Sequence, residues 1–69
     1  MTNQEDTQLT PREKEVLSYM AEGLLIKEIA DIMKLAETTV ITHRKNAMIK
    51  TNTKNSTELV AYCIRKRII

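Results

Sequence analysis

The sequence predicts an all-α domain built from four short helices. Apolar residues recur at the three- and four-residue spacing of a helix in four successive stretches, and helix-start signals precede the first and the last of them. No stretch has the alternation and flanking turns that would indicate a strand. The second and third stretches are separated by only Lys34-Leu35-Ala36, a spacing typical of a helix-turn-helix arrangement.

Size and composition indicate one small domain and exclude several classes of protein. With 69 residues, the apolar side chains must gather in a single region to form a core. Cys63 is the only cysteine, which excludes an internal disulfide or a cysteine-rich metal site and fits a reducing compartment. No apolar run approaches the roughly 20 residues that cross a bilayer, and the N-terminus is polar rather than a signal peptide. We therefore expect a soluble, cytoplasmic protein without a membrane partner.

The domain is expected to occupy residues 9–69, after a flexible tail or linker remnant at residues 1–8. Its first helix should begin at Pro11, because Thr10 is a good N-cap and Glu13 is placed to complete a capping box. Gly23 supplies the left-handed residue that ends a helix. The apolar stripe of this helix comprises Val16, Leu17, Met20 and Ala21.

The second helix should follow Leu25, a residue that cannot accept a hydrogen bond from the first free amides. Its apolar positions are Ile26, Ile29, Ala30 and Met33. The third helix is expected over residues 37–50, and the helix-turn-helix over about residues 26–45. Asn52 tolerates the left-handed conformation that would end the third helix.

Two different sides are expected for the third helix. At helical pitch, the side that can pack carries Val40, Arg44, Ala47 and Thr51. The opposite side mixes hydroxyl, aliphatic and basic residues, namely Thr38, Ile41, Thr42, Lys45 and Ile49. This mixture differs from an ordinary solvated face and suits a partner, either nucleic acid or protein.

The fourth helix should begin near Asn55, which forms a capping box in the broad sense with Glu58. The run from Leu59 to Ile64 is apolar on more faces than one core needs, so part of it should contact a partner. Charge also divides the chain. Residues 1–37 hold four of the eleven Lys and Arg and eight of the nine Asp and Glu, a net −4, whereas residues 38–69 carry a net +6. Such a basic half is typical of a surface that binds a polyanion.

Several linked motifs resemble the LuxR/GerE-type helix-turn-helix domain. They are Leu9-Thr10-Pro11-Arg12-Glu13-Lys14-Glu15-Val16-Leu17, Glu22-Gly23-Leu24, Lys27-Glu28-Ile29-Ala30 and Thr39-Val40-Ile41-Thr42-His43-Arg44, continued by Asn55, Glu58 and Leu59. The resemblance implies a four-helix DNA-binding domain from the C-terminal end of bacterial transcription regulators such as two-component response regulators. It implies double-stranded DNA as the partner, an upstream receiver or sensor domain, and RNA polymerase as a further candidate partner.

The resemblance also implies roles for individual residues. The third helix would be the recognition helix in the major groove, with Ile41, Thr42 and Lys45 at base edges. Phosphates would be contacted by Lys27, Thr38, Thr39, Asn46 and Lys50. The fourth helix would form a homodimer through Ala61, Tyr62 and Arg65. The chain departs from the family pattern at Lys34, where glycine is common, and at Ile41, where lysine is frequent.

Catalysis has little support in the sequence. One histidine, one cysteine and one glycine provide no nucleophile–base pair, phosphate loop or metal set, so we expect no enzyme, no cofactor and no metal. His43 is interpreted as a packing residue or a phosphate contact. Arg44 is as suited to an ion pair with Glu13 or Glu28 as to DNA, and we leave it out of the base-reading set. The alternative function is a protein-interaction module that keeps the helix-turn-helix frame.

Overall fold

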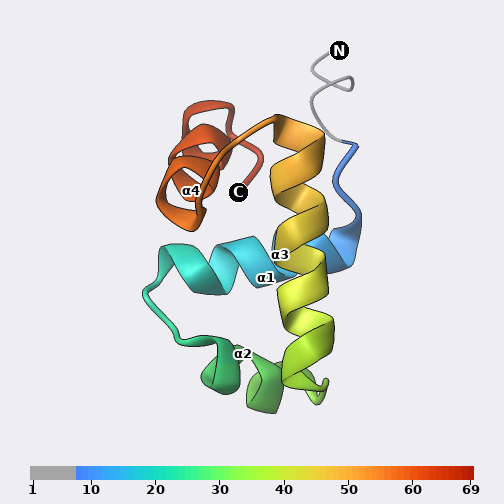
Figure 1. Cartoon of the computed structure of the whole chain (residues 1–69). Helices are drawn as coiled ribbons and strands as arrows, with labels where there is room; N and C mark the ends of the chain where they lie inside the picture. Colours follow the sequence, from blue (N-terminus) through green and yellow to red (C-terminus); the bar gives the residue numbers. More distant parts are fainter. Residues whose placement is uncertain (1–7) are drawn as a thin grey trace.

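The computed structural model describes residues 8–69 and contains four helices and no strand within that range. They are α1 (Pro11–Ala21), α2 (Ile26–Met33), α3 (Glu37–Thr51) and α4 (Ser56–Arg65). In Figure 1, α1 lies between α2 and α4, and α3 crosses all three. The predicted all-α fold class is confirmed, and α3 extends one residue past its predicted end. Of the predicted tail at residues 1–8, all but Gln8 lies outside the described residues.

The first turn of α1 forms the predicted capping box. The Thr10 side-chain oxygen accepts the Glu13 N–H at 3.1 Å, and a Glu13 carboxylate oxygen accepts the Thr10 N–H at 3.0 Å. At the other end, Gly23 has a φ of +89°, in the left-handed region that a glycine enters without strain. Local sequence signals therefore set both ends of this helix.

The helix-turn-helix joins α2 and α3 through a tight turn, as predicted. Leu25 precedes α2 without a side-chain cap, but its N–H donates to a Glu28 carboxylate oxygen at 2.7 Å. After α2, Lys34 adopts a left-handed φ of 59°, and the Leu35 N–H reaches the Ala30 carbonyl at 2.9 Å. The chain thus reverses within the three-residue link, although a lysine rather than a glycine holds the left-handed position.

Two apolar clusters meet along α3 and fix it at two points. Each cluster receives one fully buried side chain from α3, Val40 in one and Ala47 in the other, and Met20 packs against both clusters. The Val40 cluster also contains Val16, Ile29, Ala30 and Met33, and the Ala47 cluster contains Leu9, Leu17, Leu59 and Cys63. Two separate anchors along one helix fix its rotation about its own axis, and so determine which side faces solvent.

The start of α4 confirms half of its predicted capping box. The Asn55 side-chain oxygen accepts the Glu58 N–H at 2.8 Å. Glu58 does not return the bond to Asn55, because its carboxylate accepts the Lys54 N–H instead. Asn52 has a φ of 57° after α3, as predicted for a residue that tolerates this conformation.

Candidate nucleic-acid interface

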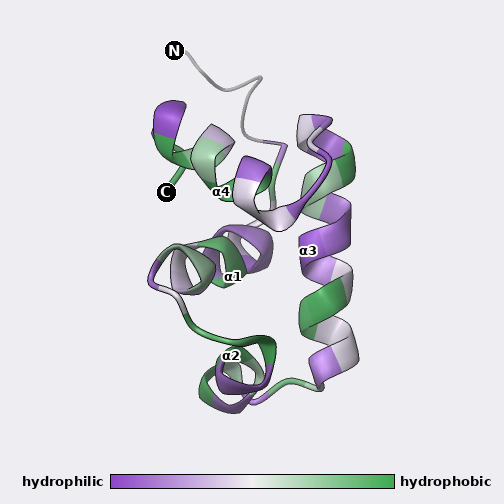
Figure 2. Cartoon of the chain, turned by 60° about the vertical axis from the view of Figure 1, so that its left-hand side comes forward, coloured by the Kyte–Doolittle hydropathy of each residue, from purple (hydrophilic) through white to green (hydrophobic). Residues whose placement is uncertain are grey.

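One side of α3 is left open to solvent by the packing of the other. Val40 and Ala47 have no exposed surface, whereas Thr38, Thr42 and Lys45 are exposed. We call Thr38, Ile41, Thr42, Lys45 and Ile49 the outer face of α3; within it, Ile41 is half-buried and Ile49 is 77% exposed. Figure 2 shows polar and apolar bands alternating along this helix. The structure thus exposes a mixed polar and apolar surface on the third helix.

The three predicted base-reading residues, Ile41, Thr42 and Lys45, lie within two turns of one another on this helix. The Thr42 hydroxyl donates to the Thr38 carbonyl at 2.9 Å, a bond to the preceding turn of its own helix. With its hydrogen used in this way, the side chain presents acceptor lone pairs and a methyl group. Lys45 is the cationic member of the outer face.

The N-terminal end of α3 is arranged so that its amides are free of a side-chain cap. Ala36 stands at the N-cap position and makes no side-chain hydrogen bond. Thr38 and Thr39 follow directly and are exposed. An uncapped helix start with exposed hydroxyls provides N–H donors and a partial positive charge, the features that bind phosphate.

The other predicted phosphate residues occupy different environments. Lys27 is exposed in the first turn of α2, and Asn46 is exposed beside the outer face of α3. Lys50, in contrast, turns towards α1. Its ammonium donates to both Glu13 carboxylate oxygens, at 2.8 and 3.1 Å, and to the Gln8 carbonyl at 3.2 Å. These three bonds use all three donors of an ammonium, so the structure gives Lys50 a different partner from the predicted phosphate.

The Glu13 carboxylate is the buried partner in this ion pair. The Glu13 side chain is 4% exposed and that of Lys50 is 30% exposed. Burial alone would raise the pKa of Glu13, but the hydrogen bonds from Lys50 and Thr10, together with the positive charges of Lys50 and His43, outweigh it. The net pKa of Glu13 is lowered from its usual value.

Of the two roles considered for Arg44, the ion pair with Glu13 or Glu28 is absent among the described residues, where Arg44 makes a different contact. An Arg44 guanidinium nitrogen donates to the Ser56 hydroxyl at 2.9 Å, which links α3 to the first residue of α4. The Arg44 Nε is buried and has no partner among the described residues. Sequence reasoning missed Ser56, because a hydroxyl in the fourth helix carried no signal that it faced the third.

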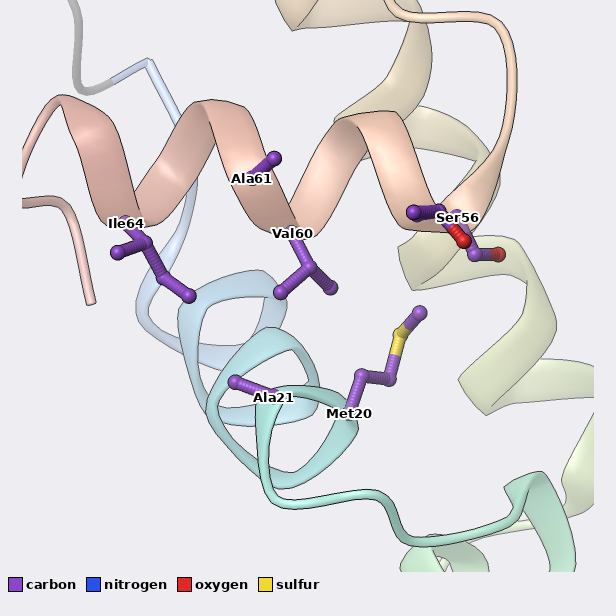
Figure 3. A pocket seen from close by; sticks show the side chains of 7 residues that line it. Met20, Ala21, Ser56, Val60, Ala61 and Ile64 are labelled. Atoms are coloured by element: carbon purple, nitrogen blue, oxygen red, sulfur yellow. The ribbon is translucent and has the colours of Figure 1, made fainter.

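Helix α4 presents three different faces. Leu59 and Cys63 are fully buried in the core, which confirms the interpretation of Cys63 as a small core residue. Val60 and Ile64 line a groove against Met20 at the end of α1 (Figure 3). Of the predicted dimer residues, Ala61 lines the same groove. Ala61 and Arg65 are exposed one turn apart, and the half-buried Tyr62 ring has the Arg65 guanidinium 5.9 Å from its centroid.

Residues 8–69 contain no cluster of three or more His, Cys, Asp or Glu side chains arranged to hold a metal ion. None of the helices in this part of the chain is long and apolar enough to span a membrane.

Comparison with known proteins finds similarity to bacterial regulatory proteins. Residues 7–63 match the family described as bacterial regulatory proteins, luxR family. The uncharacterized response regulatory protein YgeK of Escherichia coli K12 is 43% identical over 60 residues, which cover 87% of this chain and 41% of YgeK. The quorum sensing-dependent transcriptional regulator VjbR of Brucella abortus is 44% identical over 61 residues, covering 88% of this chain and 24% of VjbR.

The regulatory protein SdiA of Escherichia coli K12 is 41% identical over 58 residues, covering 84% of this chain and 24% of SdiA. The chain therefore spans less than half the length of each of these three relatives. No solved structure matches it significantly.

Proposed function

This chain belongs to the luxR family of bacterial regulatory proteins, and from that premise we propose that α3 enters the major groove of double-stranded DNA and reads its sequence. The family and the names of the relatives identify a helix-turn-helix DNA-binding domain of transcription regulation, and the family is not known for enzymatic activity. One observation carries the proposal: Val40 and Ala47 anchor α3 with no exposed surface, while its outer face stays open. A helix held in this way can enter a groove without losing its core contacts.

The base-reading residues in this proposal are Ile41, Thr42 and Lys45. Lys45 can donate to guanine O6 and N7, the acceptors that guanine presents in the major groove. Ile41 offers only apolar contact, and Thr42 offers a methyl group and acceptor lone pairs. The three side chains therefore favour different chemical features of the base edges.

Phosphate contacts are assigned to Lys27, Thr38, Thr39 and Asn46, all of which are exposed. The uncapped start of α3 supports this assignment, because its amides and partial positive charge favour an anion. Lys50 is omitted, since its ammonium already bonds Glu13 and Gln8. The net +6 over residues 38–69 adds a longer-range attraction to the DNA polyanion.

A dimer through α4 would place two recognition helices on one duplex. Ala61 and Arg65 are exposed along one side of α4, and Tyr62 lies half-buried beside them. A two-fold dimer would bind half-sites about 34 Å apart, or a multiple of that distance. Sedimentation equilibrium with and without DNA tests this arrangement, and a monomer at high protein concentration under both conditions would contradict it.

The relatives are longer than this chain, so the regulatory context belongs to the proposal as well. In such a protein, a receiver or sensor domain precedes the DNA-binding domain and RNA polymerase is a further partner. We place the activity in the bacterial cytoplasm, where the chromosome is accessible.

Fluorescence anisotropy of a labelled duplex across a salt series tests the proposed function. Binding that relies on phosphate contacts weakens steeply as salt rises, because the protein displaces counterions from the DNA. A hydrophobic protein-interaction module would show no such dependence. Failure to bind any duplex at low salt would therefore reject DNA binding and favour the alternative, in which the frame serves another protein.

A further inference from the structure

We infer that Ile41 and Thr42 together read the C5-methyl group of a thymine, so that part of the sequence preference of this domain is a preference for methylated pyrimidines. This inference rests on the proposed function and identifies the chemical feature that the recognition helix selects. It concerns the apolar part of the outer face, which phosphate contacts and the single cation Lys45 do not explain.

The first support is the hydrogen bond made by Thr42. Its hydroxyl hydrogen points to the Thr38 carbonyl, 2.9 Å away, within the same helix. A threonine bound in this way cannot donate to a base acceptor without first giving up that bond. What it retains towards the groove is a methyl group and acceptor lone pairs. The hydrogen bond within the helix thus favours apolar contact by Thr42, or acceptance of a hydrogen bond by its oxygen.

The second support is the side chain beside it. Ile41 is half-buried, carries no polar atom and stands next to Thr42 on the exposed part of α3. In the major groove, the thymine C5-methyl is the apolar feature that a base pair presents, and aliphatic or threonine methyl groups contact it well. Neighbouring side chains on a helix diverge by about 100°, so these two would approach one methyl group from different sides.

The third support separates this role from that of Lys45. Ile41 and Lys45 are four residues apart, about 6 Å along the helix axis, so their side chains lie about one turn apart on α3. This separation allows the aliphatic pair and the cation to contact different base pairs. Ile49 lies about 12 Å beyond Ile41, towards the end of α3, whereas recognition helices read bases with their N-terminal residues.

The test replaces thymine with uracil in duplex DNA. A preferred duplex is first selected from a random pool, and each thymine is then exchanged singly for deoxyuridine, which removes the methyl group and leaves the hydrogen-bonding edges unchanged. Burying one methyl group is worth about 0.8 kcal/mol, so the wild-type affinity should fall about fourfold at one thymine of each half-site. Exchange at the other thymines should leave affinity within about twofold.

Matched variants then assign the effect to the two side chains. Thr42→Ser keeps the hydroxyl and removes the methyl group, whereas Thr42→Val keeps the methyl group and removes the hydroxyl. The thymine-to-uracil difference should shrink with Thr42→Ser and with Ile41→Ala, and should persist with Thr42→Val. Ile49→Ala is the control on the same helix, and it should leave the difference unchanged. Circular dichroism of each variant checks that the helices remain folded.

Each result distinguishes this inference from the function on which it rests. Wild-type protein that binds duplex DNA in a salt-dependent manner, yet shows no loss at any uracil, would overturn methyl reading and leave DNA binding intact. A difference that disappears with Thr42→Val would likewise overturn it, because the Thr42 methyl group would then not be sufficient for the discrimination. Absence of duplex binding at low salt would instead reject the proposed function itself.

Discussion

The ammonium of Lys50, in the last turn of α3, bonds both carboxylate oxygens of Glu13, in the first turn of α1, at 2.8 and 3.1 Å. The same carboxylate accepts the Thr10 N–H at 3.0 Å, so one side chain closes the cap of α1 and joins that helix to α3. Because the Glu13 side chain is only 4% exposed, its charge depends on these partners in place of water. The pair fixes the C-terminal end of α3, and Val40 fixes the helix nearer its start.

Glu13→Gln should lower the free energy of unfolding by roughly 1 to 3 kcal/mol. Glutamine keeps the size of the side chain and an oxygen for the Thr10 N–H, but it removes the charge that pairs with Lys50. The partial exposure of Lys50, at 30% of its side chain, keeps the loss below that of a fully buried pair. Urea unfolding followed by far-ultraviolet circular dichroism measures the change.

The matched control is Glu15→Gln, which breaks the Arg12–Glu15 ion pair in the same helix. That pair is 3.3 Å long, with side chains 53% and 43% exposed, and exposed pairs contribute about 0.2 to 1 kcal/mol. The Glu15 variant should therefore unfold at nearly the wild-type urea concentration. Equal losses of unfolding free energy in the two variants would show that burial of the Glu13–Lys50 pair adds nothing to stability.

The same ion pair should make stability depend on pH in the acidic range. The pKa of Glu13 is lowered in the folded protein, so its carboxylate stabilises the fold fully above the unfolded pKa, near 4.5. This contribution should decrease as the pH falls below about 5 and be lost once the pH drops below the folded pKa. Urea midpoints of wild type and Glu13→Gln should therefore converge on acidification. A constant difference between them across that range would contradict a charge-based role.

The capping boxes and the ion pairs differ in how far the sequence predicts them. The Thr10–Glu13 cap depends on residues three apart, whose geometry the helix itself sets, and the prediction is confirmed. The partners of Lys50 and Arg44 depend instead on where α1 and α4 cross α3. Long side chains can reach several neighbours, so charge and spacing alone did not identify Glu13 as the partner of Lys50 or Ser56 as the partner of Arg44.

The outer face of α3 shows the same division. Helical periodicity correctly separated the buried Val40 and Ala47 from the exposed Thr38, Thr42 and Lys45. The hydrogen bond from the Thr42 hydroxyl to the Thr38 carbonyl was not predicted, because the hydroxyl of a threonine within a helix can either bond the preceding turn or face solvent. The sequence pattern indicates which face of α3 is exposed, but the hydrogen bonds on that face depend on side-chain rotamers that the pattern does not specify.

Lys34→Gly should raise the free energy of unfolding by about 1 kcal/mol. Lys34 has a φ of 59°, a conformation that costs a residue with a Cβ roughly 1 to 2 kcal/mol. Glycine removes this strain, but its greater freedom in the unfolded chain offsets part of the gain in stability. Asn52→Gly is the control, since Asn52 has a φ of 57° but tolerates it better, and its gain should be smaller. A Lys34→Gly variant that unfolds at lower urea than wild type would contradict strain at this turn.

Lys27→Ala and Lys50→Met should affect DNA binding differently, although both remove one positive charge. The exposed Lys27 is proposed to contact phosphate, so its loss should weaken binding to all duplexes alike. It should also reduce the salt slope, that is, the slope of log affinity against log salt concentration, by about one. Lys50 is committed to Glu13, so Lys50→Met should reduce stability and leave the salt slope nearly unchanged. Anisotropy titrations at several salt concentrations, below the unfolding temperature of each variant, provide both slopes. A lower slope with Lys50→Met would return this residue to the phosphate contacts.

Lys45→Met should relax sequence preference at one base pair, with a loss of roughly 1 to 3 kcal/mol against the preferred duplex if the contact is bidentate. Lys45→Arg should retain the preference, because a guanidinium can also bond guanine O6 and N7. Lys54→Met, an exposed lysine in the link between α3 and α4, is the matched control for charge and should leave the preference profile unchanged. Selection from a random duplex pool with each variant measures the profiles, and a Lys45→Met profile identical to wild type would remove Lys45 from the base-reading set.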